Sequence, residues 1–233
     1  MEAPAKLQNC YWILRHGLSK PNEAGLIVSS VDNGVMPEHG LADAGKEQAK
    51  QAGRTLRNAL VAEKVDVRTL SIFASPFSRT QETAAIAAAE LAQDGEGPES
   101  PSIQEAIELR ERYFGPDFEL RSHEKYPEIW AMDAKDPSVG PTGGESVLDV
   151  AARLQALVRK VESQTSGRHV LFVSHGDTLQ ILQALLSGAF LSQSLLAGSV
   201  ETVVLKALST HRTFALGTGE LRRLAIAPNE SDA

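Results

Sequence analysis

The stretch HVLFVSHGDTLQILQALLSG, residues 169–188, decides the fold class of this chain. Its first six residues form a near-continuous apolar run, which is typical of a strand buried on both faces of a parallel sheet. The polar group Ser174-His175-Gly176 follows the strand. The apolar-rich segment after it is predicted to form a helix, and Asp177 is expected to be the N-cap of this helix. A buried strand that passes directly into a helix is the repeating unit of α/β folds.

Two earlier segments repeat this pattern. Residues 9–14 predict a strand that ends in Arg15-His16-Gly17, and residues 70–74 predict a strand that ends in Ser75-Pro76. Helices are predicted over residues 43–63, from 78 to about 91, and from 147 to 161, where apolar residues recur at i, i+3, i+4 and i+7. The sequence therefore predicts an α/β three-layer sandwich, with a mostly parallel central sheet flanked by helices on both faces.

Local signals refine these boundaries. Ser78 with Gln81 three residues later fits a helix-capping box, and Ser146 is expected to cap the helix that follows it. Residues 25–40 and 93–102 are rich in turn-forming residues and predict loops. Short strands are predicted within residues 108–116, over 201–205 and over 220–224. We expect a single domain over residues 1–233, with its core at about 9–226 and an insertion at about 109–143.

Composition limits the function classes. The chain of 233 residues is 42% hydrophobic and 23% charged, as in ordinary globular proteins. Its net charge of −7 argues against a nucleic-acid partner, and no apolar run is long enough to predict a membrane partner. Cys10 is the only cysteine and the N-terminus lacks the apolar core of a signal peptide, so we expect a reducing, cytoplasmic location. The oligomeric state is open, and a homodimer is one of the options.

The polar groups that follow the three strands predict a site. If these strands are parallel neighbours, their carboxyl ends meet at one edge of the sheet, where ligands bind in such folds. Two imidazoles, of His16 and His175, would then lie with two guanidiniums, of Arg15 and Arg79, beside helix N-termini. Arginine forks match the oxygens of a phosphoryl group, and helix N-termini favour anions. The predicted ligand is therefore a small phosphorylated molecule.

These motifs resemble those of a known family. The segments LRHGLSKPN, GLADAGKEQAKQAG, SPFSRTQETA, LRERYFG, GGES and VSHGDTLQ, in this order, are similar to the histidine phosphatase superfamily, also called the phosphoglycerate mutase-like proteins. The resemblance extends from about residue 11 to about residue 186, which is most of the chain. A single Arg-His-Gly triplet would be a weak signal, but the ordered set is specific.

The resemblance implies a covalent mechanism without metal or cofactor. His16 would attack phosphorus, with its reacting nitrogen unprotonated and its other nitrogen donating a hydrogen bond to a backbone carbonyl. Arg15, Arg79 and His175 would hold the phosphoryl oxygens. Glu111 would act as general acid and then as general base, which requires a raised pKa. The expected substrate contacts are Asn22, Gly17, Ser19, Gly176 and Arg112.

Hydrolases and mutases both belong to this family, and four positions favour a hydrolase. Ser122 stands where the mutases carry a lysine, and no arginine pair follows it before the glycine-rich turn. Phe114 replaces a tyrosine, and Leu18 replaces an acidic or amide residue. A phosphomonoesterase is therefore the main prediction, with a mutase-type phosphotransferase and a non-catalytic phosphate-binding module as alternatives. A substrate-recognition patch and an ordinary mixed-charge surface are both open for Arg112, Arg121, His123 and Lys125.

Overall fold

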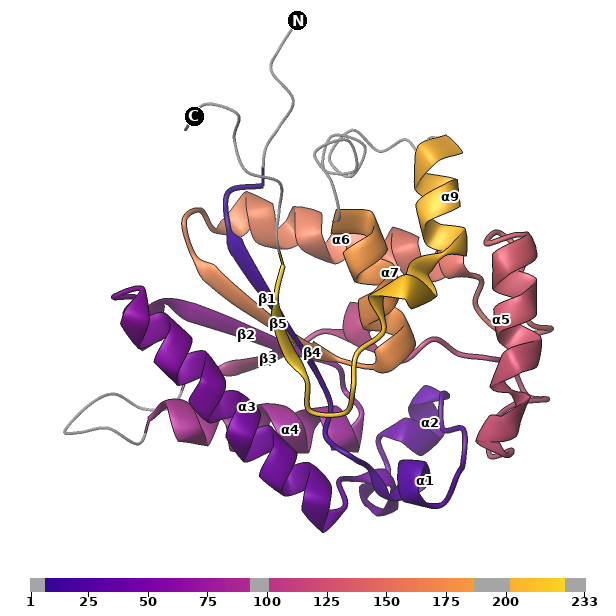
Figure 1. Cartoon of the computed structure of the whole chain (residues 1–233), viewed down its shortest axis with the longest axis horizontal. Coiled ribbons are helices and arrows are strands. Elements are labelled where there is room, and N and C mark those ends of the chain that lie inside the picture. The colour runs from indigo at the N-terminus through magenta and orange to yellow at the C-terminus, as the bar shows by residue number, and fades with distance from the viewer. Residues whose placement is uncertain (1–6, 93–100, 187–201, 225–233) are drawn as a thin grey trace, which may run out of the picture.

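The described residues of the chain fold around a five-stranded sheet (Figure 1). The structure is a computed structural model that describes residues 7–92, 101–186 and 202–224. The strands are β1 (Cys10–Arg15), β2 (Leu70–Ala74), β3 (Ile103–Glu105), β4 (His169–Ser174) and β5 (Leu221–Arg223). Their order across the sheet is β3-β2-β4-β1-β5; β1 to β4 run parallel to one another, and β5 pairs antiparallel with β1.

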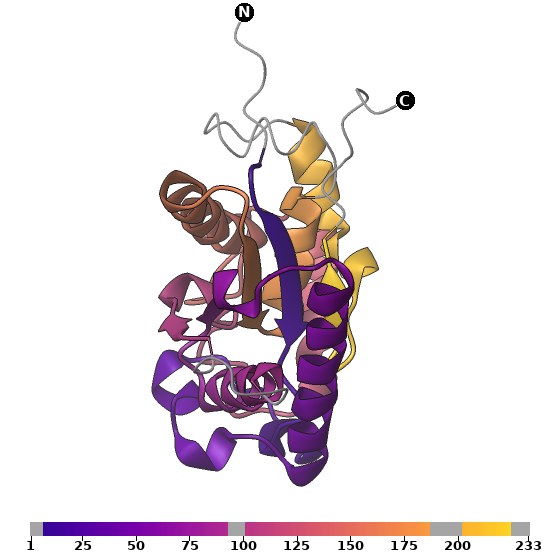
Figure 2. The ribbon, with the colours of Figure 1, turned by 90° about the vertical axis from the view of Figure 1, so that its left-hand side faces the viewer.

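Helices cover both faces of the sheet, and Figure 2 shows α3 and α6 on opposite sides of the strands. The helices are α1 (Lys20–Glu23), α2 (Val31–Gly34), α3 (Asp43–Ala62), α4 (Ser78–Leu91), α5 (Tyr126–Lys135), α6 (Val147–Gln164), α7 (Gly176–Leu186) and α9 (Thr202–Ser209). Short 3-10 segments are η1 (Pro37–His39), η2 (Val67–Thr69), η3 (Ile107–Leu109), η4 (His123–Lys125) and η5 (His211–Phe214). The predicted three-layer α/β architecture is confirmed.

Strand alternation divides the core into two layers. In β1, Tyr11 and Ile13 pack with the buried stripe of α6 and with α7, whereas Trp12 and Leu14 pack with α3 and α4. Successive side chains of a strand point to opposite faces, so a strand that is apolar throughout must be covered on both sides. The three long predicted helices and the three main strands lie within three residues of their predicted bounds; the largest difference is at the end of α6, which continues to Gln164.

The predicted capping box at Ser78 is wrong. Ser78 is already the first residue of α4, the N-cap position belongs to Phe77, and no side chain caps the helix. The Ser78 hydroxyl instead donates to the backbone carbonyl of Val35, at 2.7 Å. By contrast, Ser146 caps α6 as predicted and forms a capping box with Asp149.

Tertiary packing overrides local propensity in other segments. The strand predicted over 201–205 is wrong, because α9 is a helix whose Leu208 is buried in the core beside α6 and α7. The strand predicted within 108–116 is also wrong: η3 and irregular backbone occupy this stretch, and the parallel strand β3 precedes it. The predicted loop over 25–40 contains α2 and η1. Most of the predicted loop over 93–102 lies outside the described residues.

The insertion forms a small core of its own beside the carboxyl ends of the strands. Ile27, Phe114, Phe118 and Ile129 are buried together, with Tyr126, Trp130 and Met132 packed against them. This cluster holds α5, which the sequence did not predict, at the side of the molecule beyond α7 and α2 (Figure 1). In the described ranges, no helix has both the length and the apolar character needed to cross a membrane.

Candidate active site

The register of the parallel strands brings three strand ends together. Arg15 of β1 lies opposite Ser174 of β4, and Ala74 of β2 lies opposite Val173 of β4. The residues that follow these positions therefore meet at one edge of the sheet. The ring centroids of His16 and His175 are 5.2 Å apart, although the two residues are far apart in the sequence.

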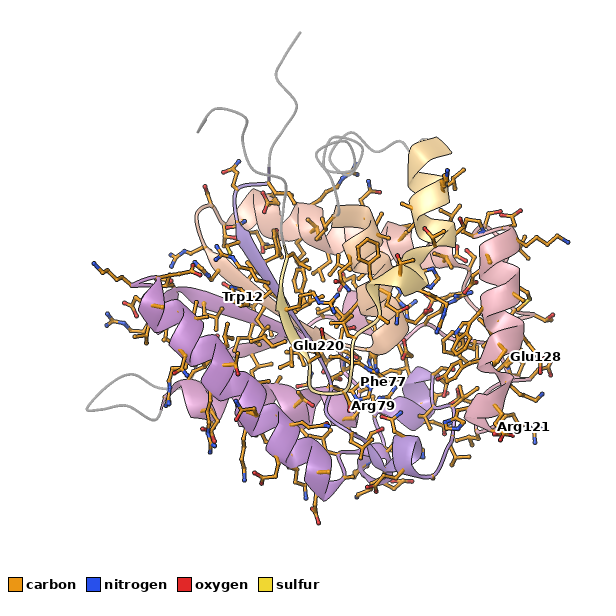
Figure 3. All side chains as sticks on the ribbon, viewed as in Figure 1. Trp12, Phe77, Arg79, Arg121, Glu128 and Glu220 are labelled. Carbon is orange, nitrogen blue, oxygen red and sulfur yellow. The ribbon has the colours of Figure 1, made fainter. Side chains whose placement is uncertain are left out.

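Arg79 enters the same site from the first turn of α4, and Figure 3 shows it with Phe77 beside the ends of the central strands. Its Nε lies 3.3 Å from Nε2 of His16. The two imidazoles and two guanidiniums that the sequence predicted to converge therefore do so. Arg15, His16 and Arg79 line a cavity of about 320 Å³, whereas His175, next to His16, is outside this lining. The cavity is lined by Arg15, His16, Ser19, Pro21, Asn22, Leu26, Val28, Arg79, Glu111, Phe114, His123, Tyr126, Trp130, Gly176, Asp177, Gln180, Arg212, Ala215 and Leu216.

His16 is held in the form that a nucleophile requires. Its Nδ1 lies 2.7 Å from the carbonyl oxygen of Gly17, which can only accept, so Nδ1 carries the proton. Its Nε2 accepts from the N–H of Arg79 and therefore presents a lone pair. Burial, followed by the charges of Arg79 and Arg15, holds the pKa of His16 well below its usual value. The predicted hydrogen bond to a backbone carbonyl is confirmed.

His175 is also neutral and buried. Burial, together with the charge of Arg79, lowers its pKa well below the usual value. Its Nε2 is 2.8 Å from the hydroxyl oxygen of Ser75, which also accepts from the backbone N–H of Phe77. If the Ser75 hydroxyl donates to Nε2, Nδ1 of His175 carries the ring proton. That Nδ1 lies 3.9 Å from Oε2 of Glu111 and has no hydrogen-bond partner among the described residues.

The two arginines are fixed by backbone carbonyls but keep donors free. Arg15 donates from Nη1 to Leu216, at 2.6 Å, and Arg79 donates from Nη2 to Val28, at 2.9 Å. Nε of Arg15 and Nη1 of Arg79 are buried, and no acceptor in the described ranges pairs with them. A buried donor without a partner costs roughly 1–3 kcal/mol, more when it is charged. Both arginines line the cavity, and an anion bound there would satisfy these two donors. Nδ1 of His175 is also buried without a partner in the described ranges, but His175 itself is outside the cavity lining.

Glu111 has the pKa that a general acid needs near neutral pH. Only 8% of the residue is exposed, and its Oε1 accepts from the backbone N–H of Arg112 and from the hydroxyl of Thr178. Burial raises its pKa to about 6 against the opposing charge of Arg79, with a smaller upward contribution from Asp177. The raised pKa expected from the sequence is confirmed.

Three predicted substrate contacts line the cavity. Ser19 caps α1, and Oδ1 of Asn22 accepts from both the backbone and the hydroxyl of Ser19. The Nδ2 end of the Asn22 amide is therefore the end available to a phosphoryl oxygen. Gly176 lies against the Arg15 guanidinium, where an added Cβ would come within 3.3 Å of its Cζ. Because Gly176 has no side chain, the Arg15 guanidinium can pack against its backbone.

Gly17 does not border the cavity, which corrects its predicted role as a substrate contact. Its backbone N–H donates to the hydroxyl of Thr83, at 3.1 Å, so it is not available to an anion. A Cβ at this position would lie 2.3 Å from the carbonyl oxygen of Gly45. The glycine is therefore required by the close approach of α3, and its carbonyl orients His16.

Arg112 is also placed differently from the prediction. It is fully buried and outside the cavity lining. Its guanidinium donates to both carboxylate oxygens of Asp133, at 2.7 and 2.8 Å, and to Asp177, at 3.3 Å. Asp177 also binds His211, at 2.9 Å, so its carboxylate joins two cations within the first turn of α7 rather than capping that helix. This network fixes the backbone beside Glu111.

We expect Arg112→Met to lower the free energy of unfolding by about 3–5 kcal/mol, because it leaves Asp133 buried without its partner. Urea unfolding followed by circular dichroism measures the change. Arg121→Met is the matched control: Arg121 is exposed and outside the cavity lining, and its effect should stay within about 0.5 kcal/mol. Unchanged stability of Arg112→Met together with a raised KM would instead make Arg112 a substrate contact.

A single substrate-recognition patch was one of two interpretations open for Arg112, Arg121, His123 and Lys125, and the structure contradicts it. Of its four members only His123 lines the cavity. Lys125 lies over the ring of Phe118, 5.5 Å from its centroid, and Arg121 lies far from Arg79 at the outer end of α5 (Figure 3).

Sequence reasoning missed the roles of Tyr126, Gln180 and Arg212 in the cavity wall. Tyr126 and Trp130 come from α5, Gln180 from α7 and Arg212 from η5. The rings of Tyr126 and Trp130 stack with an interplanar angle of 2°. No sequence pattern connects these segments, and the packing of α5 against the C-terminal segment brings them together. The spacing of Tyr126 and Trp130, four residues apart, was the one local signal of a helix face.

The family assignment follows from these features. The family model of the histidine phosphatase superfamily (branch 1) matches residues 11–214. This chain belongs to that superfamily.

The proteins similar to this chain include a named mutase and, at the level of fold, a named phosphatase. A 2,3-bisphosphoglycerate-dependent phosphoglycerate mutase of Methylorubrum populi is 32% identical over 187 residues, covering 76% of this chain and 78% of that protein. An uncharacterized protein of Mycobacterium tuberculosis is 31% identical over 181 residues, covering 76% and 77%. The solved structure of mycobacterial glucosyl-3-phosphoglycerate phosphatase in complex with VO3 has a TM-score of 0.66 at 22% identity, covering 92% and 90% of the two chains. That likeness shows the shared fold.

Proposed function

We propose that this protein is a phosphomonoesterase that hydrolyses a small phosphorylated metabolite through a phosphohistidine at His16. One observation carries the proposal: two buried donors without acceptors among the described residues, on Arg15 and Arg79, border the same cavity as the lone pair of His16. A tetrahedral dianion supplies oxygens for these donors and places its phosphorus in front of Nε2. The donors then stabilise the charge that spreads over the phosphoryl oxygens in the transition state.

The reaction has two balanced steps. In the first, Nε2 of His16 forms a bond to phosphorus, the bond from phosphorus to the ester oxygen breaks, and the Glu111 carboxyl gives its proton to the departing alkoxide. In the second, the Glu111 carboxylate takes a proton from water, the hydroxide oxygen bonds to phosphorus, and the bond to Nε2 breaks. Inorganic phosphate leaves, and both side chains return to their starting states.

The side chains supply the positive charge that a metal ion provides in many phosphatases. Arg15 and Arg79 are both buried enough for burial to lower their pKa values, that of Arg79 to about 10, so both remain charged at neutral pH. The described part of the chain contains no group of three His, Cys, Asp or Glu side chains that could hold a metal ion. We therefore expect activity to be unaffected by a chelator.

Mutase-type phosphotransfer is the second candidate, because relatives at about 30% identity carry that name. Hydrolysis is favoured because the position that holds a lysine in the mutases carries no cation in this chain. It is Ser122, which caps η4 through the Glu124 backbone N–H and lies outside the cavity lining. A mutase needs cations to hold a second charged group and must keep water from the phosphohistidine.

The test is a panel of phosphomonoesters assayed for phosphate release with and without EDTA. We expect release from at least one small substrate, with equal rates in both conditions. Loss of activity with EDTA would overturn metal independence, and no turnover of any ester would favour a phosphate-binding module.

Trapping of the phosphoenzyme separates hydrolase from mutase. After brief exposure to a labelled substrate, a hydrolase should lose the label from His16 to water, at a rate that added phosphoglycerate does not change. Label that persists in buffer and passes to phosphoglycerate would show a mutase instead.

A further inference from the structure

We propose that Arg212, held flat against Trp130, binds an anionic group on the alcohol part of the substrate, and that Gln180 binds a hydroxyl of the same part. The preferred substrate is then the phosphate ester of a small hydroxy acid. This inference rests on the phosphatase function proposed above and names the substrate class of that site.

Arg212 is a cation of the cavity wall whose guanidinium has no hydrogen bond or ion pair with the described residues. Its Cζ lies 3.3 Å from the centroid of the Trp130 ring. In the described residues no acceptor lies within hydrogen-bond distance of its guanidinium, and no carboxylate forms an ion pair with it. Asp177, a carboxylate of the same lining, is already paired with Arg112 and His211. The N–H edges of the guanidinium are therefore free for a ligand.

The surroundings hold this guanidinium in place. Arg212 follows His211, whose buried ring is bound by Asp177 on one side and by the carbonyl of Leu208 on the other. A stacked guanidinium keeps its planar donor edge for bidentate contact with a carboxylate, and the ordering cost on binding is small. Trp130 is already stacked with both Arg212 and Tyr126, so the wall offers a cation rather than a free aromatic face.

Gln180 supplies the second polar contact. It is 7% exposed, lines the cavity, and its Oε1 is buried without a donor among the described residues. An amide oxygen in this state is stabilised by a hydroxyl of the ligand. Leu26, Val28 and Phe114 contribute apolar side chains to the same lining. A cavity of about 320 Å³ is at the lower end for small-molecule sites, which favours a short acid over a nucleotide.

A matched pair of substrates tests the inference. 3-Phosphoglycerate and glycerol 3-phosphate share the phosphate ester and the hydroxyl at C2, and they differ only in carboxylate against hydroxymethyl. We expect wild-type kcat/KM to favour 3-phosphoglycerate by about tenfold or more, the size of one charge-assisted hydrogen-bond pair in a partly exposed setting. Equal values for the two esters would overturn the proposal.

The variants assign the preference to residues. Arg212→Gln should lower the ratio of the two kcat/KM values to near one, and Arg212→Lys should retain part of it, because the charge stays but the planar fork is lost. Gln180→Leu should lower both kcat/KM values and leave their ratio unchanged. Arg121→Gln, at an exposed position away from the cavity, is the matched control and should behave as the wild type. A ratio that survives Arg212→Gln would overturn the role of Arg212.

Binding to the His16→Ala variant separates this inference from the phosphatase function. Isothermal titration calorimetry should show tighter binding of 3-phosphoglycerate than of glycerol 3-phosphate, and the difference should disappear when Arg212→Gln is added. A binding preference without hydrolysis by the wild type would retain the recognition site and reject the hydrolase. Hydrolysis by the wild type together with equal binding of the two esters would retain the hydrolase and reject the recognition site.

Discussion

Replacing His16 with alanine is expected to reduce kcat/KM for phosphomonoesters on the order of 10⁵-fold, the largest effect of any single substitution in this protein. The imidazole supplies the lone pair that accepts from Nε of Arg79, and its neutral state is fixed by burial and by the Gly17 carbonyl. Without it, the first step has no nucleophile. Steady-state phosphate release measures the loss, and acid quenching should detect no phosphoenzyme.

His39→Ala is the matched control for this prediction. The His39 ring also binds a backbone carbonyl through Nδ1, that of Asn33 at 2.7 Å, but it does not line the cavity. Its kcat/KM should stay within about twofold of the wild-type value, since surface changes away from the site have small effects. If His16→Ala retains wild-type turnover while its thermal unfolding is normal, the nucleophile assignment is wrong.

Glu111→Gln should reduce kcat/KM for alkyl phosphates by about 10²–10⁴-fold, the range for loss of a general acid. An alkoxide is a poor leaving group unless it is protonated as the bond to phosphorus breaks. p-Nitrophenolate leaves without a proton, so kcat/KM for p-nitrophenyl phosphate should fall much less. Equal losses for both kinds of ester would show that Glu111 acts on binding or structure rather than on the leaving group.

The pH dependence gives a second measure of Glu111. The general acid acts when protonated, and its pKa is about 6, so kcat/KM for alkyl phosphates should fall as the pH rises through about 6. His16 stays neutral across this range because its pKa is held well below the usual value. The fall should be absent in Glu111→Gln. If kcat/KM of Glu111→Gln still falls as the pH rises through about 6, the fall is caused by a titratable group other than Glu111.

Glu111→Gln, which is expected to lower activity, should raise the stability of the folded protein at high pH. Burial raises the pKa of Glu111 to about 6 from 4.5 in the unfolded chain, so the folded state holds the proton more tightly. Stability from this group is full below pH 4.5 and is lost as the pH rises through 6, by about 2 kcal/mol in all. Glu111→Gln should therefore unfold at a higher temperature than the wild type at pH 8 and not at pH 4.

Much of the fold could be predicted because its main strands and helices follow from local patterns of apolar residues. The apolar run of β4, the alternating faces of β1 and the stripe of α6 each depend on burial with a period of two or 3.6 residues. The segments that the sequence misassigned have no such pattern. In α9, Thr-Val-Val favours a strand, yet packing of Leu208 against the core selects a helix. At Ser78, the capping signal was present but the hydroxyl bound Val35 instead.

The candidate site was predictable for the same reason, as far as it lies at strand ends. Parallel strands carry their following residues to one edge, so His16 and His175 had to meet once the topology was known. The direction in which a longer side chain points is not fixed by its position in the chain. Arg112 is adjacent to Glu111, but Asp133 and Asp177 draw its guanidinium into the interior.

The sequence by itself determined the α/β class, the order of the main elements and the meeting of His16, His175, Arg15 and Arg79 at one edge of the sheet, because strand ends and helix starts are local events. Only the tertiary structure decided which donors are left without acceptors, that Gly17 makes room for α3, and that Arg212 stacks on Trp130. These features depend on contacts between residues distant in the chain. Their energies come from burial and pairing, which no single segment specifies.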